Sequence, residues 1–168
     1  MSENVSKNEN LSDQDYIEYM SREFVNTCSW FLMRKTVRVL TNYINYKLKE
    51  TGILSTQLGT LAVLADQKEL NISELAKELV MDQTTATRNI NQLQKDDLVK
   101  IAEGTDRRIR NVSLTDKGKK KLEQALPIWE INQRNLTQQL GTENTKILGD
   151  LLSGILILLQ KEMSGIRE

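Results

Sequence analysis

The chain has no histidine and only one cysteine among its 168 residues. The absence of histidine removes the commonest general base and the commonest metal ligand. Without histidine, and with a single cysteine, neither a zinc site nor a Cys-His or Ser-His catalytic pair can form. No glycine-rich phosphate-binding loop and no distinctive pair of acidic residues is seen either. We therefore expect a protein that is not an enzyme and that needs no metal or cofactor.

Long apolar runs are also missing. The best candidate, residues 147–159, is interrupted by Asp150 and Ser153 and is shorter than the roughly 20 residues of a membrane helix. Residues 1–11 are polar and lack the apolar core of a secretory signal, so we expect a flexible tail there. The single cysteine rules out an intrachain disulfide and suits a reducing compartment. These features predict a cytoplasmic protein without a membrane partner.

The chain carries no net charge, with 23 basic and 23 acidic residues, but the charges are unevenly distributed. Residues 104–121 contain seven Lys or Arg and two Asp, a local net charge of +5, which leaves −5 on the remainder. A basic patch of this kind is the usual electrostatic footprint of phosphate binding.

Two short helices are predicted after residue 70. Asn71 and Glu74 have the spacing of a capping box, which provides acceptors for unpaired N–H groups at a helix start. The expected buried face of the first helix consists of Ile72, Leu75, Ala76 and Leu79. Asp82 suits the N-cap of the second helix, because a carboxylate stabilises the positive end of the helix dipole. The expected buried stripe of that helix is Ala86, Ile90 and Leu93.

The opposite face of the second helix is polar and has no acidic residue from Gln83 to Lys95. Its members are Thr84, Arg88, Asn91 and Lys95, flanked by Gln83, Thr87 and Gln92. Asn and Gln can pair with adenine, Arg with guanine, and a Thr methyl can contact the methyl group of thymine. We interpret this face as one that reads DNA bases. An ordinary polar surface helix is the alternative interpretation.

A basic hairpin is predicted next. Residues 98–101 and 111–114 are short β-prone runs, and residues 103–106 have turn chemistry. The tip carries Asp106, Arg107, Arg108 and Arg110. We expect one arginine to pair with Asp106 and brace the hairpin while another enters the minor groove. A helix-turn-helix followed by such a hairpin predicts duplex DNA binding, with the helix in the major groove.

Long helices are predicted on both sides of this region. Residues 12–50 are helix-periodic, with a start at Ser12, a break near Asn26 and Thr27, and a stop at Gly52. A further helix opens at residues 54–57, and its expected buried residues are Leu58, Leu61, Ala62 and Leu64. Residues 116–140 form another predicted helix, which Pro127 should kink or divide.

The last predicted helix begins at Thr142 or Glu143 and ends near Met163. Apolar residues cover more than half of its circumference: Ile147, Leu148, Leu151, Leu152, Ile155, Leu156, Leu158 and Leu159. A monomer surface rarely exposes such a helix, so we expect a partner subunit to cover it. Burial within the same chain is the alternative.

Several of these segments together resemble the MarR family of bacterial and archaeal transcription regulators, from about Phe31 to the C-terminus. The matching segments are Ile72-Ser73-Glu74-Leu75-Ala76, Thr85-Ala86-Thr87-Arg88, Leu93, Asp106-Arg107-Arg108, Val112-Ser113-Leu114-Thr115 and Gly118. The resemblance implies a mainly α fold with a small β-wing, in which dimerisation helices flank a winged helix-turn-helix. It also implies an obligate homodimer, a palindromic operator, and release from DNA when a small molecule binds or a cysteine is oxidised.

The expected organisation is a tail at 1–11, an N-terminal dimerisation arm at 12–51, a DNA-binding domain at 52–115 and C-terminal dimerisation helices at 116–168. The expected DNA contacts are Ser73, Gln83, Thr84, Thr85, Thr87, Arg88, Asn91, Gln92, Lys95, Arg107, Arg108 and Arg110. The leading hypothesis is a dimeric, sequence-specific transcriptional regulator, a ligand-released repressor that binds an operator in double-stranded DNA. A winged-helix module that binds proteins and not DNA is an alternative.

Two regulatory routes follow from the resemblance. Trp30, Phe31, Arg34 and Arg38 lie where family members bind aromatic acids, so the resemblance implies a small aromatic or anionic effector. These four residues also fit a simple packing and surface role. Cys28 is the candidate for a redox-sensing regulator, because some members sense oxidants through a cysteine in the first helix. A lone cysteine also occurs as a small buried hydrophobe.

Overall fold

The computed structural model describes residues 12–103 and 110–165. Its contacts divide the chain into two compact units, residues 1–47 and 48–168, and each is described by itself. Asp106, Arg107 and Arg108, the predicted brace and two of the predicted wing arginines, lie outside the described residues. Within the described ranges, no helix is both long and apolar enough to cross a membrane.

The first unit consists of two helices, α1 (Asp13–Thr27) and most of α2 (Ser29–Leu48). The predicted start is confirmed, because the Ser12 hydroxyl caps α1 by accepting the Asp15 N–H at 3.3 Å. The predicted break lies at Cys28, whose backbone is extended. Phe24 contacts the rings of Phe31 and Trp30 across this break, with centroids 5.2 and 6.1 Å apart.

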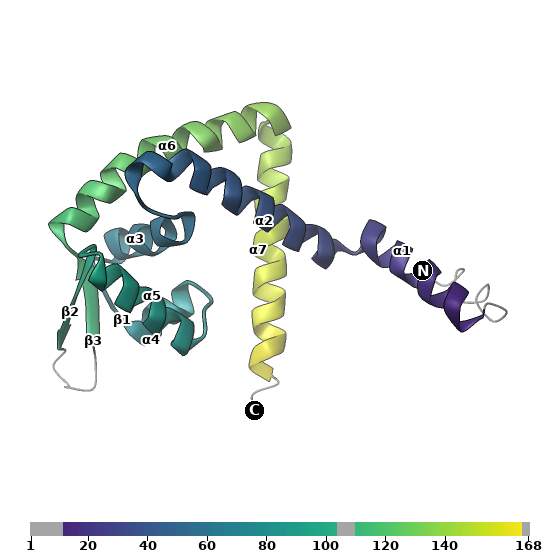
Figure 1. Cartoon of the computed structure of the whole chain (residues 1–168), viewed down its shortest axis with the longest axis horizontal. Coiled ribbons are helices and arrows are strands. Elements are labelled where there is room, and N and C mark those ends of the chain that lie inside the picture. The colour runs from purple at the N-terminus through teal and green to yellow at the C-terminus, as the bar shows by residue number, and fades with distance from the viewer. Residues whose placement is uncertain (1–11, 104–109, 166–168) are drawn as a thin grey trace. The chain divides into compact units, whose positions relative to one another are not determined.

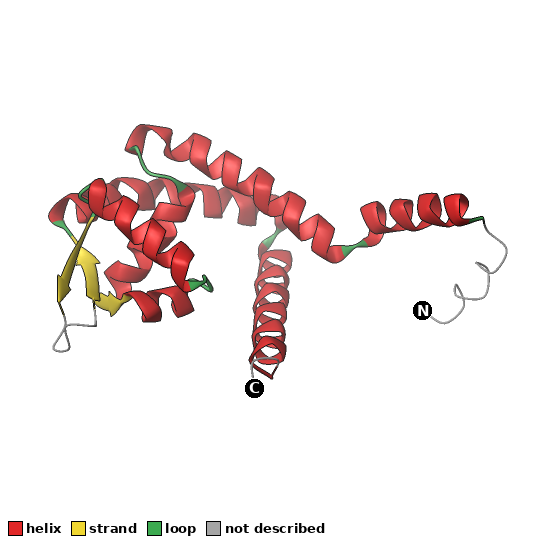
Figure 2. Ribbon diagram, turned by 60° about the horizontal axis from the view of Figure 1, so that its bottom comes forward, coloured by secondary structure: helices red, strands yellow, loops and turns green. Residues whose placement is uncertain are grey.

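In the second unit, short helices group beside a small sheet (Figures 1 and 2). Its elements are a short 3-10 helix η1 (Lys49–Thr51), then α3 (Ser55–Gln67), β1 (Glu69–Asn71), α4 (Ile72–Glu78), α5 (Gln83–Lys95), β2 (Val99–Glu103), β3 (Arg110–Leu114), α6 (Asp116–Leu140) and α7 (Thr142–Gly165). This mainly helical architecture with a three-stranded antiparallel sheet is the predicted fold class. Gly52 ends η1 in the left-handed region, at φ 73°, where glycine is favoured.

The core of the second unit lies between α3, α4, α5 and the sheet. The predicted buried residues Leu75, Ala76, Ala86, Ile90 and Leu93 are all at most 4% exposed. Leu58, Leu61 and Leu64 of α3 are also buried in this core. Ala62 of α3 and Leu79, which follows α4, were expected to be buried but are only half-buried. The helical periodicity of the sequence therefore identified most of the residues that pack here.

The sheet has the order β1-β3-β2, and both pairings are antiparallel. Val112, in the central strand, is paired with Leu70 on one side and Ile101 on the other. The sequence analysis did not predict β1, because three residues without a β-branched or aromatic side chain give no strand signal. Pairing with β3 creates this strand, so it is a product of the tertiary structure.

Pro127 does not divide α6, which is continuous from Asp116 to Leu140. Of the two expected effects, a kink or a division, the division was wrong, and the kink stays a prediction. Proline lacks one N–H and so leaves only the carbonyl of Glu123 without its helical donor. Both Glu123 and Pro127 are exposed, so water can solvate that carbonyl and the helix continues.

Candidate nucleic-acid interface

The start of α5 is fixed by the predicted N-cap. Asp82 accepts the Thr85 N–H at 2.8 Å and the Thr85 hydroxyl at 2.7 Å. The hydroxyl of Thr85, followed by its backbone N–H, lowers the pKa of Asp82 below its ordinary value. Thr85 is thereby held at the cap and is half-buried, so it is less available for DNA than the sequence analysis expected.

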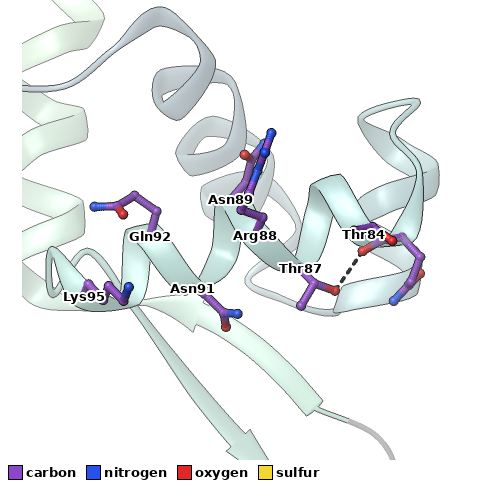
Figure 3. Close-up of a pocket in the computed structure, with 8 residues that line it drawn as sticks. Thr84, Thr87, Arg88, Asn89, Asn91, Gln92 and Lys95 are labelled. Carbon is purple, nitrogen blue, oxygen red and sulfur yellow. Dashed lines mark hydrogen bonds between the residues drawn. The ribbon is translucent and has the colours of Figure 1, made fainter.

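The outer face of α5 forms an open hollow (Figure 3). It is lined by Gln83, Thr84, Thr87, Arg88, Asn89, Asn91, Gln92 and Lys95. Seven of these eight residues were predicted as the base-reading face, and the structure brings them together. The eighth, Asn89, is half-buried and was missed, although its spacing of three from Gln92 places the two on one side of the helix.

The residues of this face differ in how they are already engaged. The Thr87 hydroxyl donates to the Gln83 carbonyl at 2.7 Å, which leaves its methyl group and a lone pair for other contacts. The Asn89 amide donates to the Met81 sulfur at 3.5 Å. Among the described residues, no side-chain hydrogen-bond partner is found for Arg88, Asn91 or Lys95, and all three are exposed. These three side chains are free to contact a ligand, as are those of Gln83 and Thr84, which are also exposed and have no side-chain partner among the described residues.

Two other predicted contacts lie outside the hollow. Ser73 is exposed in the first turn of α4. Arg110 is exposed at the start of β3, directly opposite Glu103 in the sheet register. Neither is contradicted as a DNA contact, and both remain predictions.

The end of α5 is locked to the start of α6. Thr115 caps α6, donates its hydroxyl to the Asp97 carbonyl at 2.7 Å and donates its N–H to the Leu98 carbonyl at 3.1 Å. Lys117 donates to the Asp96 carbonyl at 2.7 Å. The chain turns between the helix and the strand at Asp97, whose φ is +59°. These contacts fix the orientation of α5 relative to the base of the hairpin.

Several lysines of the predicted basic patch make contacts within the protein. Lys117 binds the Asp96 carbonyl, and Lys121 donates to the carbonyl of Thr51. Lys119 is paired with Asp116 at 3.3 Å, although both side chains remain largely exposed. The local charge of +5 counted in the sequence consequently overstates the number of cations that are free to bind phosphate.

Comparison with known proteins shows to which family this chain belongs. A family model described as "MarR family" matches residues 51–109. The regulator SarZ of Staphylococcus aureus is 31% identical over 107 residues, which cover 62% of this chain and 69% of SarZ. The chain belongs to the MarR family. The resemblance seen in the sequence is confirmed, and these relatives are transcriptional regulators rather than enzymes.

Two further transcriptional regulators extend the comparison. YdgJ of Bacillus subtilis, an uncharacterized HTH-type transcriptional regulator, is 29% identical over 104 residues, and the match spans 63% of its length. The regulator MosR of M. tuberculosis, in its crystal structure with DNA, is 29% identical, with a TM-score of 0.68 over 78% of this chain and 98% of MosR. The similarity to MosR extends beyond the segment that the MarR model matches.

The predicted effector residues of this MarR-family chain all lie on α2, within the first unit. Arg34 lies over the Trp30 ring, 5.4 Å from its centroid, and Lys35 lies over the Phe31 ring at 5.6 Å. Arg38 is exposed, and Cys28 is half-buried at the break between α1 and α2. A cation–π contact already engages Arg34. The effector role of these four residues and the redox role of Cys28 remain predictions.

Proposed function

We propose that this MarR-family chain is a sequence-specific, DNA-binding transcriptional regulator that places α5 in the major groove. The observation that carries the proposal is the outer face of α5, where Arg88, Asn91 and Lys95 are exposed, unpaired among the described residues, and free of acidic neighbours in the hollow. Arginine and asparagine are side chains that read guanine and adenine in that groove. The crystal structure of MosR with DNA supports the same use of the fold.

We further propose that the regulator acts as a homodimer on a palindromic operator. Nine apolar residues of α7 are 37–67% exposed in the single chain: Ile147, Leu148, Leu151, Leu152, Ile155, Leu156, Ile157, Leu158 and Leu159. An apolar surface of this extent marks a protein interface. Two-fold pairing would present two copies of α5 to successive major grooves, about 34 Å apart. Release by a small aromatic or anionic effector, and repression rather than activation, belong to the same proposal.

The proposal is tested by unbiased selection of duplex fragments from a genomic pool, followed by titration of the enriched site. We expect an inverted repeat, and we expect affinity to fall steeply between about 50 and 200 mM salt. Arg88→Ala should weaken specific binding by about 1–3 kcal/mol and relax base preference at one position of each half-site.

Arg134→Ala is the matched control. Arg134 is also an exposed arginine, but it lies on α6 and is paired with Glu130 at 2.7 Å. It should leave base preference unchanged. Failure to enrich any duplex would overturn the proposal and favour a winged helix that binds a protein partner.

A further inference from the structure

Asp96, the residue that follows α5, accepts hydrogen bonds from two glutamines. The Gln92 amide nitrogen lies 3.2 Å from both carboxylate oxygens, and the amide nitrogen of Gln57, from the first turn of α3, lies 3.5 Å from Oδ2. Gln57 and Asp96 are 39 residues apart in the sequence, so the fold alone creates this cluster. Gln92 is one of the residues that line the hollow on α5.

The chemistry of the cluster fixes which way each amide points. Gln57 accepts the Leu54 N–H through Oε1 at 2.8 Å, so its nitrogen has to be the atom that faces Asp96. A carboxylate offers only acceptors, so Gln92 must also direct its nitrogen toward Asp96. The Oε1 atom of Gln92 is then the end of the amide turned away from the carboxylate.

Asp96 is itself held in place. Its N–H donates to the Gln92 carbonyl at 3.0 Å, its carbonyl accepts from Lys117 at 2.7 Å, and the residue is half-buried. These contacts hold the backbone of Asp96, and the Gln57 amide holds the carboxylate, which resists movement of the carboxylate with the Gln92 side chain. Reversing the Gln92 amide would place an oxygen against a carboxylate, which replaces a charge-assisted hydrogen bond by a repulsion.

We propose that Asp96 is a positioning residue that determines base preference by making Gln92 present an acceptor to the DNA. An unconstrained glutamine can present either its oxygen or its nitrogen to a base edge. Because its nitrogen faces Asp96 and its oxygen is turned away from the carboxylate, Gln92 favours an edge that offers a donor, the amino group of cytosine or adenine, over the acceptors of guanine. This inference rests on the proposed function, because it assigns a direction of reading to the same face of α5.

The test compares the binding-site preferences of the wild-type chain, Asp96→Asn and Asp97→Asn, obtained by the same duplex selection. Asparagine at 96 can donate as well as accept, so the Gln92 amide is free to reverse. We expect the preference for a donor-bearing base at one position of each half-site to fall from about fivefold to less than twofold. Asp97→Asn removes the same charge one residue away at an exposed position whose positive φ suits asparagine, and it should keep the preference.

Gln92→Ala provides a second, independent measurement. It should abolish the preference at the same position, and Asp96→Asn should add nothing further in that background, since the aspartate acts through the glutamine. The inference is overturned if Asp96→Asn loses affinity equally for all sequences or keeps the wild-type base preference. It is also overturned if Asp97→Asn changes the base preference as much as Asp96→Asn does. If the wild-type chain itself selects no sequence, the proposed function fails instead.

Discussion

Replacing Gly118 by alanine should be among the most damaging single-methyl changes in the chain. Gly118 is buried in the first turn of α6, and a Cβ atom there would lie 2.0 Å from the Leu98 carbonyl oxygen and 3.0 Å from its carbon. Leu98 cannot move aside easily. Its N–H donates to the Leu93 carbonyl at 2.9 Å, its own carbonyl accepts from Thr115 at 3.1 Å, and its side chain is 4% exposed.

The size of the effect follows from what must be displaced. Alanine improves helix propensity by about 1 kcal/mol over glycine. Against this, forcing a methyl group into filled space costs about 1–3 kcal/mol. Moving α6 away from Leu98 also weakens the hydrogen bonds of Thr115 to Leu98 and Asp97, each worth about 1 kcal/mol. We expect the free energy of unfolding to fall by about 3 kcal/mol.

Urea denaturation followed by circular dichroism, at one fixed protein concentration, measures this change. Gly59→Ala is the matched control, because Gly59 also lies in a helix, α3. Apart from its chain neighbours and the backbone of its own helix, no atom lies within 4 Å of a methyl group added there. That substitution should raise the free energy of unfolding by up to about 1 kcal/mol. The close contact between α6 and Leu98 would be refuted if both substitutions changed the free energy of unfolding in the same direction. It would also be refuted if the Gly118→Ala protein were as stable as the wild type.

Two further predictions concern pH and assembly. The folded-state pKa of Asp82 is lowered, chiefly by the Thr85 hydroxyl, so its stabilising contribution is present at neutral pH and is lost as the pH falls through that lowered pKa. Urea titrations at several pH values should show the stability advantage of the wild type over Asp82→Asn shrinking below about pH 4, and an advantage independent of pH would contradict this. Sedimentation should show that Leu158→Glu converts a dimer to the 19.3 kDa monomer, whereas Gln160→Glu, with the same charge change on α7, remains dimeric. A wild-type chain that sediments as a monomer at micromolar concentration would rule out the proposed dimer.

The helices and their caps could be predicted from the sequence because their signals are local. Asn71 and Glu74 form their reciprocal cap over three residues, and Asp82 caps α5 in the same way. The buried stripe of Ala86, Ile90 and Leu93 leaves the opposite, polar face of α5 exposed, so the candidate site on this helix was also visible in the sequence. Helical geometry alone relates these positions.

The tertiary structure decided the contacts between distant segments. It made β1 a strand by pairing Leu70 with Val112, and it assigned Lys117 to the Asp96 carbonyl rather than to a free basic patch. It also brought Gln57 to the carboxylate of Asp96, the group that Gln92 contacts at the end of α5. A sequence pattern reports the preferences of neighbouring residues, whereas a hydrogen bond across 39 residues exists only after packing has brought its donor and acceptor together.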